Sequence, residues 1–104
     1  AHTWCYFFEK ADLARQMKDW NEVLDLYQQV QRLGFNSQYG AEYIPFIEAF
    51  AQTGDWQKAY DLTIAAEKLT SHHKTIFCSN WVRLAQIPSA DMMLVEQIDQ
   101  NLSC

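Results

Sequence analysis

The stretch Gln52-Thr53-Gly54-Asp55-Trp56 decides the fold that the sequence predicts. Its Asp-Trp pair also occurs 36 residues earlier, at Asp19-Trp20, and Asp91-Met92 keeps the same phase 36 residues later. Gly commonly ends a helix and Asp is a favoured N-cap, so the stretch predicts a tight turn between two helices. A period in the mid-thirties then predicts three copies of one two-helix unit.

Six amphipathic helices are predicted from apolar residues that recur every three or four positions. They are expected at about residues 3–18, 20–33, 43–53, 56–70, 74–86 and 92–102. The second helices of the three copies share apolar columns spaced by 36 residues, such as Leu26, Leu62 and Ile98. The chain is therefore expected to be all-α, a single domain with repeat units at approximately 3–36, 39–72 and 74–104.

The turn at residues 52–56, with Ala59 after it, resembles the tetratricopeptide repeat family, whose units have a small residue, an acidic residue, an aromatic residue and then alanine at this spacing. The likeness covers about residues 3–102, and the second unit matches best. Ala11 fits the family's small residue in the first helix, whereas Lys18 and Ile47 depart from the pattern. The resemblance implies a right-handed α-solenoid of three antiparallel helix hairpins that binds a protein or peptide partner.

A second resemblance rests on residues 4–15 (WCYFFEKADLAR) and 45–49 (PFIEA). These segments are similar to the soluble C-terminal tails of bacterial multi-pass membrane proteins related to glycosyltransferases. This resemblance implies a soluble domain tethered to the bacterial inner membrane through an upstream region, with any transferase chemistry outside these residues. Ala1 is not an initiator methionine, which also indicates a piece of a longer protein.

Composition narrows the function classes. The formal net charge is −5 and no cluster of Lys and Arg occurs, so binding to nucleic acid is not expected. Apolar runs such as residues 6–8 are too short to enter a bilayer as a span. Cys5, Cys78 and Cys104 are odd in number and widely spaced, so no disulfide framework is expected, and a reducing compartment is compatible.

The expected partner site lies on the first helices of the units, which line the groove in tetratricopeptide arrays. The residues expected to point into it are Glu9, Asp12, Arg15, Gln16, Ile44, Glu48 and Gln52. Asp12 and Glu48 are 36 residues apart and should form an acidic ladder that suits a basic or amide-rich peptide. The alternative reading is that these charges only keep a helix face solvated.

No catalytic residue, cofactor or metal site is predicted. His2, Cys5 and Glu9, or His72, His73 and Cys78, do not match a compact zinc pattern. Trp20 and Trp56 begin second helices and are expected to pack in the core. An alternative function is a structural tail that packs on its own parent enzyme, and the aromatic first helix is the expected face for such docking or for self-association.

Overall fold

The computed structural model describes residues 3–104 and is all-helical over that range. Six α-helices and one 3-10 turn (η1) follow one another along the chain, which confirms the predicted number and type of elements. Their bounds are α1 Trp4–Gln16, α2 Trp20–Leu33, η1 Gly40–Tyr43, α3 Ile44–Gln52, α4 Trp56–Glu67, α5 Lys74–Leu84 and α6 Met92–Leu102. None of these helices is long and apolar enough to cross a membrane.

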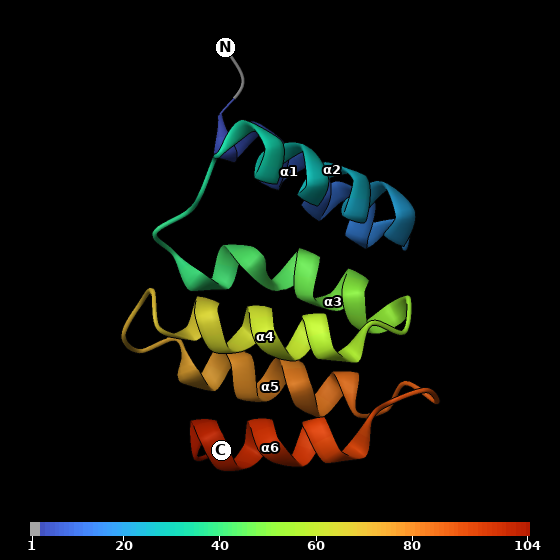
Figure 1. Ribbon diagram of the computed structural model, residues 1–104, viewed down its shortest axis with the longest axis vertical. Helices are drawn as coiled ribbons and strands as arrows, with labels where there is room; N and C mark the ends of the chain where they lie inside the picture. The colour runs from blue at the N-terminus through green and yellow to red at the C-terminus, as the bar shows by residue number, and fades with distance from the viewer. Residues whose placement is uncertain (1–2) are drawn as a thin grey trace.

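The helices pack in consecutive pairs: α1 against α2, α3 against α4, and α5 against α6. Successive pairs are layered along the long axis of the molecule, with α1 and α2 at one end and α6 at the other (Figure 1). Within this arrangement α1 contacts α3 and α3 contacts α5, so the first helices of the three pairs are neighbours. The core runs through all three pairs.

The second helix of every pair begins at the predicted aspartate cap. The side chain of Asp19 accepts a hydrogen bond from the backbone N–H of Glu22, and Asp55 accepts one from that of Lys58. Asp91 accepts hydrogen bonds from the first turn of α6 in the same way. Each cap satisfies donors that a helix N-terminus otherwise leaves without a partner, which explains why the Asp period of 36 residues marks the architecture.

The turns that precede α2 and α4 have the same backbone path but different residues. Lys18 adopts a φ of 57° where Gly54 has a φ of 90°. Both turns close with a backbone hydrogen bond of 2.8 Å, from Asp19 to Ala14 and from Asp55 to Phe50. A left-handed φ is unfavourable for lysine because its Cβ crowds the backbone, and glycine has no such penalty.

Lys18→Gly is therefore expected to raise the free energy of unfolding by about 0.5–1 kcal/mol, because relief of the left-handed strain exceeds the extra entropy of glycine in the unfolded chain. Urea unfolding monitored by circular dichroism measures the change. The reciprocal variant Gly54→Lys should lower stability by a similar amount, since no atom lies within 4 Å of the added Cβ and only the backbone is strained. A loss of stability in Lys18→Gly would contradict this account.

The third pair departs from the strict period in its first helix. Buried positions recur after 36 residues between α1 and α3, as in Ala11 and Ile47, but after 34 residues between α3 and α5, as in Ile47 and Trp81. By the helix bounds, the connection into α5 is four residues shorter than that into α3, and the turn between α5 and α6 is four residues longer than that between α3 and α4. The phase of the second helices is thereby restored, since α6 begins 36 residues after α4.

The connection between α2 and α3 is tied to its surroundings at several points. The indole N–H of Trp4 donates to the Glu42 carboxylate over 2.9 Å, and the Ser37 hydroxyl donates to the same oxygen. The Gly40 N–H donates to the Thr70 hydroxyl over 3.0 Å. Gly40 also lies directly against α4, with no room for a side chain. The predicted loop is therefore an ordered bridge between the first and second pairs.

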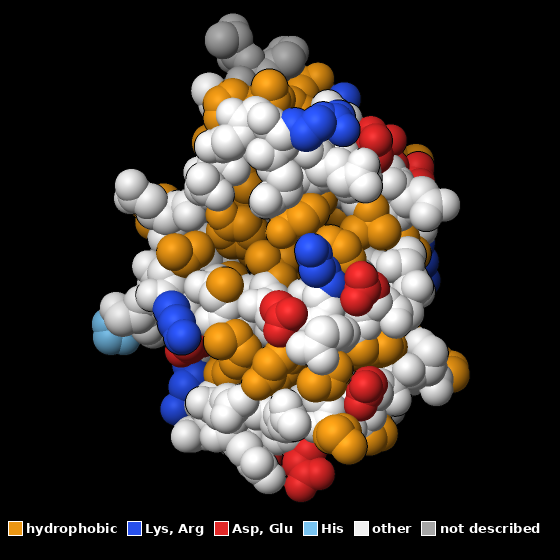
Figure 2. Space-filling view, in the orientation of Figure 1, with side chains coloured by type: hydrophobic (Ala, Val, Ile, Leu, Met, Phe, Trp, Pro, Cys, Tyr) orange, Lys and Arg blue, Asp and Glu red, His pale blue; other side chains and the backbone are white. Residues whose placement is uncertain are grey.

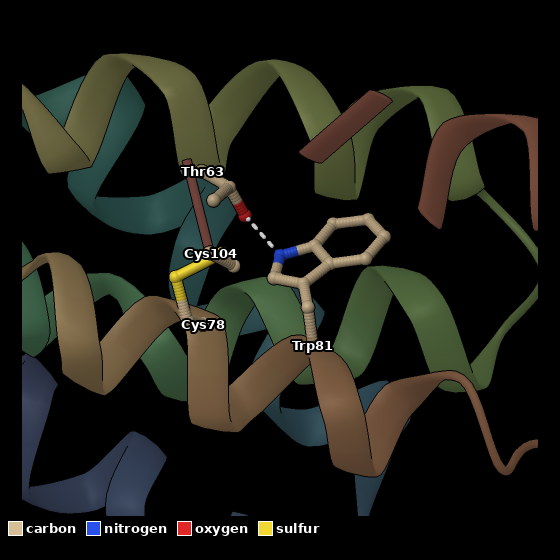
Figure 3. The surroundings of a disulfide bond; sticks show 4 residues. All are labelled: Thr63, Cys78, Trp81 and Cys104. Atoms are coloured by element: carbon tan, nitrogen blue, oxygen red, sulfur yellow. Dashed lines mark hydrogen bonds between the residues drawn. A yellow bond between two sulfur atoms is a disulfide. The ribbon is translucent and has the colours of Figure 1, made fainter. Parts of the chain in front are cut away.

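Cys78 and Cys104 form a disulfide with a Cα–Cα distance of 5.7 Å, so the expectation of no disulfide is wrong. The pairing joins the first half of α5 to Cys104, two residues after the end of α6, because these helices lie side by side and run in opposite directions (Figure 1). Beside it the Trp81 indole N–H donates to the Thr63 hydroxyl of α4 over 2.9 Å (Figure 3). The third pair is thus fixed both within itself and to the second pair.

Three tryptophans lie in the core, as expected for scaffold residues. Trp4 and Trp81 are buried, and so is Trp56, whose ring centroid lies 5.9 Å from that of Trp81. Trp20 is only half-buried and lines a surface hollow, so its burial differs from that of Trp56 at the same repeat position. Two residues expected in the apolar stripe of α1, Leu13 and Met17, are 58% and 72% exposed.

Candidate partner-binding face

Most of the predicted partner residues surround two adjoining hollows, which we call the first-helix face. One hollow, of about 240 Å³, is lined by Phe8, Asp12, Arg15, Ala41, Ile44, Pro45, Glu48 and Arg83. The other, of about 300 Å³, is lined by Arg15, Gln16, Lys18, Trp20, Glu48, Gln52, Arg83, Leu84 and Ile87. Arg15, Glu48 and Arg83 belong to both hollows and form the boundary between them. Glu9 is exposed and lines neither.

The predicted acidic ladder is compensated by arginines. Asp12 accepts hydrogen bonds from the Arg15 Nε over 2.9 Å and from the Gln16 amide over 3.1 Å. The Arg83 guanidinium lies 3.9 Å from Glu48 and also donates to Asn80 over 3.3 Å. Two carboxylates and two guanidinium groups therefore alternate across α1, α3 and α5, and the face has no net charge at these four positions.

Glu48 is the unusual member of this group because its side chain is only 16% exposed. Burial raises the pKa of its carboxyl above the ordinary value of 4.5. The guanidinium groups of Arg15 and Arg83 oppose that rise, and the Asp12 carboxylate adds to it. At 3.9 Å the contact with Arg83 is too long for a hydrogen bond, so this desolvated carboxylate can still accept one from a bound group.

Glu48→Gln is expected to raise the free energy of unfolding at neutral pH. A carboxyl whose pKa is raised by folding binds its proton more tightly in the native state, so its ionisation above that pKa costs stability. Below the ordinary pKa, at about pH 4, the carboxyl is protonated in both states and the penalty disappears. Urea unfolding at pH 7 and near pH 3.5 should therefore show an advantage for Glu48→Gln only at the higher pH.

The matched control is Asp61→Asn, which neutralises an exposed carboxylate on α4 that accepts a hydrogen bond from Gln57. An exposed substitution of this kind should change stability by less than about 0.5 kcal/mol at either pH. If Glu48→Gln shifted stability equally at both pH values, burial of the charge would not be its cause.

Nothing in the sequence pattern indicated Arg83 as a member of the site. It belongs to the third unit and lies outside the column formed by Asp12 and Glu48, which continues to Leu84 at a spacing of 36 residues or to Val82 at 34. Its guanidinium is brought to Glu48 only by the packing of α5 against α3. Comparing the charges on neighbouring first helices, and not only those at equivalent repeat positions, would indicate Arg83.

A larger hollow, of about 500 Å³, lies among α2, α3 and α4 and was missed by sequence reasoning. Hydrophobic side chains gather in this part of the molecule with charged groups around them (Figure 2). Tyr27 and Phe50 contribute to its floor with ring centroids 5.2 Å apart. Two of its charged groups are engaged within the fold, since Asp55 caps α4 and Lys58 lies over the Phe50 ring. The first-helix face, with its weakly paired Glu48, is the better candidate site.

The histidines and cysteines weighed as metal ligands do not gather. His2 lies outside the described residues, Cys5 is exposed as a thiol, and Cys78 is held in the disulfide. Within residues 3–104, no three His, Cys, Asp or Glu side chains are placed to hold a metal ion. The chemistry available at the first-helix face is hydrogen bonding and charge pairing.

Comparison of the chain with family models, with curated proteins and with solved structures finds no match.

Proposed function

We propose that this chain is a tetratricopeptide-like interaction module, a right-handed stack of three helix hairpins that binds an extended peptide segment of a partner protein on the first-helix face. The observation that carries the proposal is Glu48, a carboxylate that is only 16% exposed and lies on the boundary between two adjoining hollows. The period of 36 residues and the Asp caps at its turns support the tetratricopeptide-like assignment.

The chemistry of the face favours an amide-rich segment over a strongly basic one. Glu48 offers an acceptor, while the exposed Arg83 guanidinium and the amide of Gln52 offer donors. A backbone or an Asn or Gln side chain presents both a donor and an acceptor and can satisfy these groups together. A basic peptide would meet the acidic groups favourably and be repelled by the two arginines beside them.

The experiment is selection from a displayed library of short unstructured peptides, followed by fluorescence anisotropy titration of the enriched sequences. The enriched peptides should be rich in Asn and Gln. The double variant Asp12→Asn/Glu48→Gln should weaken their binding by about tenfold or more, as expected when a charge-assisted hydrogen bond to a buried carboxylate is lost.

The matched control is Asp25→Asn/Asp61→Asn, which removes two carboxylates that are also 36 residues apart but lie on the second helices. Both are exposed and accept hydrogen bonds from neighbouring glutamines, Asp25 from Gln29 and Asp61 from Gln57. Peptide affinity should be unchanged in this control. Binding that survives Asp12→Asn/Glu48→Gln and is lost in the control would refute the assignment of the site.

A further inference from the structure

An apolar groove lies between α5 and α6, on the side of α6 away from α4; we call it the end groove. It has a volume of about 430 Å³ and is lined by Cys78, Trp81, Val82, Ala85, Gln86, Met92, Val95, Glu96, Ile98, Asp99 and Cys104. Val82 and Met92, which both line the groove, are 67% and 58% exposed, and exposed apolar side chains that are grouped in this way mark contact surfaces. The groove is therefore a surface that the fold itself leaves open.

The end groove on the third helix pair is equivalent to surfaces on the first and second pairs that are covered by the next helix. Asp99 follows Thr63 and Tyr27 at intervals of 36 residues on the second helices. Tyr27 packs against α3, and the Tyr27 ring centroid lies 5.3 Å from that of Phe46. Thr63 contacts α5, because its hydroxyl accepts the 2.9 Å hydrogen bond from the Trp81 indole N–H. At each earlier level, the first helix of the next pair packs on this column.

The first helices carry a matching column. Phe46 of α3 and Asn80 of α5 occupy equivalent positions, given the 34-residue spacing of buried residues there, and both are fully buried. The equivalent residue of α1, which lies 36 residues before Phe46, is Lys10, and it is exposed. Tyr27 contacts Phe46, whose equivalent on α1 is Lys10, and Thr63 contacts Trp81, whose equivalent on α1 is Ala11. A helix stacked on the end groove in the phase of the fold would therefore place Lys10 and Ala11 beside Asp99.

The α1 face that includes Lys10 has the composition of a contact surface. Leu13 and Met17 are exposed there, one and two turns from Lys10. Tyr6 lies one turn before Lys10, accepts a hydrogen bond from its ammonium over 3.3 Å and presents its ring to it. Within residues 3–104, Lys10 has no carboxylate partner, and neither Glu96 nor Asp99 has a basic one.

We propose that the end groove receives α1 of a second copy of this chain, with Lys10 of that copy paired with Asp99. Three observations converge on this occupant: the column phase, the opposite charges at the two ends, and the exposed apolar residues on both surfaces. The contact joins two different faces, so it is head-to-tail and each added copy offers a new end groove.

Association should be weak and should depend on concentration, because each copy has a net charge of −5 and the copies repel one another. It extends the packing of the fold and uses none of the groups of the first-helix face. Peptide binding there and self-stacking can therefore succeed or fail separately.

Sedimentation equilibrium of the 104-residue chain with its disulfide intact tests the proposal, over concentrations up to about 1 mM. The weight-average mass should rise beyond that of a dimer without reaching a plateau. Lys10→Glu and Asp99→Lys should each weaken association by about tenfold or more, because each places like charges together. The double variant Lys10→Glu/Asp99→Lys should restore it.

Charge-matched controls are Lys68→Glu and Asp25→Lys, which alter exposed positions outside both surfaces and should leave association unchanged. Carbodiimide coupling with mixed isotope labels provides a second measurement, and Lys10 of one copy should become linked to Asp99 of another. A wild-type mass that stays monomeric, a plateau at the dimer, or single reversals without effect would each overturn the proposal. So would failure of the double variant to restore association.

Discussion

Reduction of the Cys78–Cys104 disulfide is expected to lower the free energy of unfolding by about 3 kcal/mol. The cross-link closes a loop with a sequence separation of 26 residues, and removing it returns conformational entropy to the unfolded chain. Urea unfolding with and without a thiol reductant measures the loss directly. The stability of the third helix pair is therefore tied to the redox state of its surroundings.

The control for reductant effects is Cys5→Ser, which removes the exposed free thiol and should leave the difference between oxidised and reduced protein intact. The double variant Cys78→Ser/Cys104→Ser should match the reduced wild type and no longer respond to reductant. Coincident unfolding curves for oxidised and reduced wild-type protein would show that this cross-link contributes nothing.

Gly40→Ala is expected to lower the free energy of unfolding by about 3 kcal/mol, near the upper end of the usual cost of overpacking. A Cβ at this position would lie 2.1 Å from the carbonyl oxygen of Ala66 and 3.4 Å from Cζ of Phe77. The oxygen belongs to the backbone of α4, so it cannot move aside as a flexible side chain could. Thermal and urea unfolding of the variant measure the cost.

Gly54→Ala is the matched control, because no atom lies within 4 Å of a Cβ at that position. Its φ of 90° makes alanine unfavourable by about 1 kcal/mol for conformational reasons alone, as for Gly54→Lys. The expected order of stability is therefore wild type, then Gly54→Ala, then Gly40→Ala. The reverse order of the two variants would mean that the α4 contact is loose.

The sequence predicted the helices well because their signals are local. Apolar spacing and caps act within one turn, and α2 begins and ends at the predicted residues 20 and 33. The all-α class and the number of helices are confirmed, whereas the tetratricopeptide-like stacking remains a proposal. The disulfide was missed because the spacing of Cys78 and Cys104 reveals nothing until two helices lie side by side.

The candidate site was predictable only in part, for a related reason. The period placed Asp12 and Glu48 at equivalent positions, and in the structure Asp12, Arg15, Gln16, Glu48 and Gln52 lie around the two adjoining hollows. The period did not reveal that arginines balance the two carboxylates, because Arg83 does not share the column of Asp12 and Glu48. Nor did it reveal the burial of Glu48, which depends on three helices that are distant in sequence.

The ordered bridge between α2 and α3 has a consequence for how the molecule comes apart. In an array whose units contact only their neighbours, end units can open independently. Here the bridge holds α1 through Trp4 and Glu42, and it holds the far end of α4 through Gly40 and Thr70. Opening the first pair would therefore strip contacts from the second, so the four N-terminal helices open as one cooperative unit rather than as two separate ones.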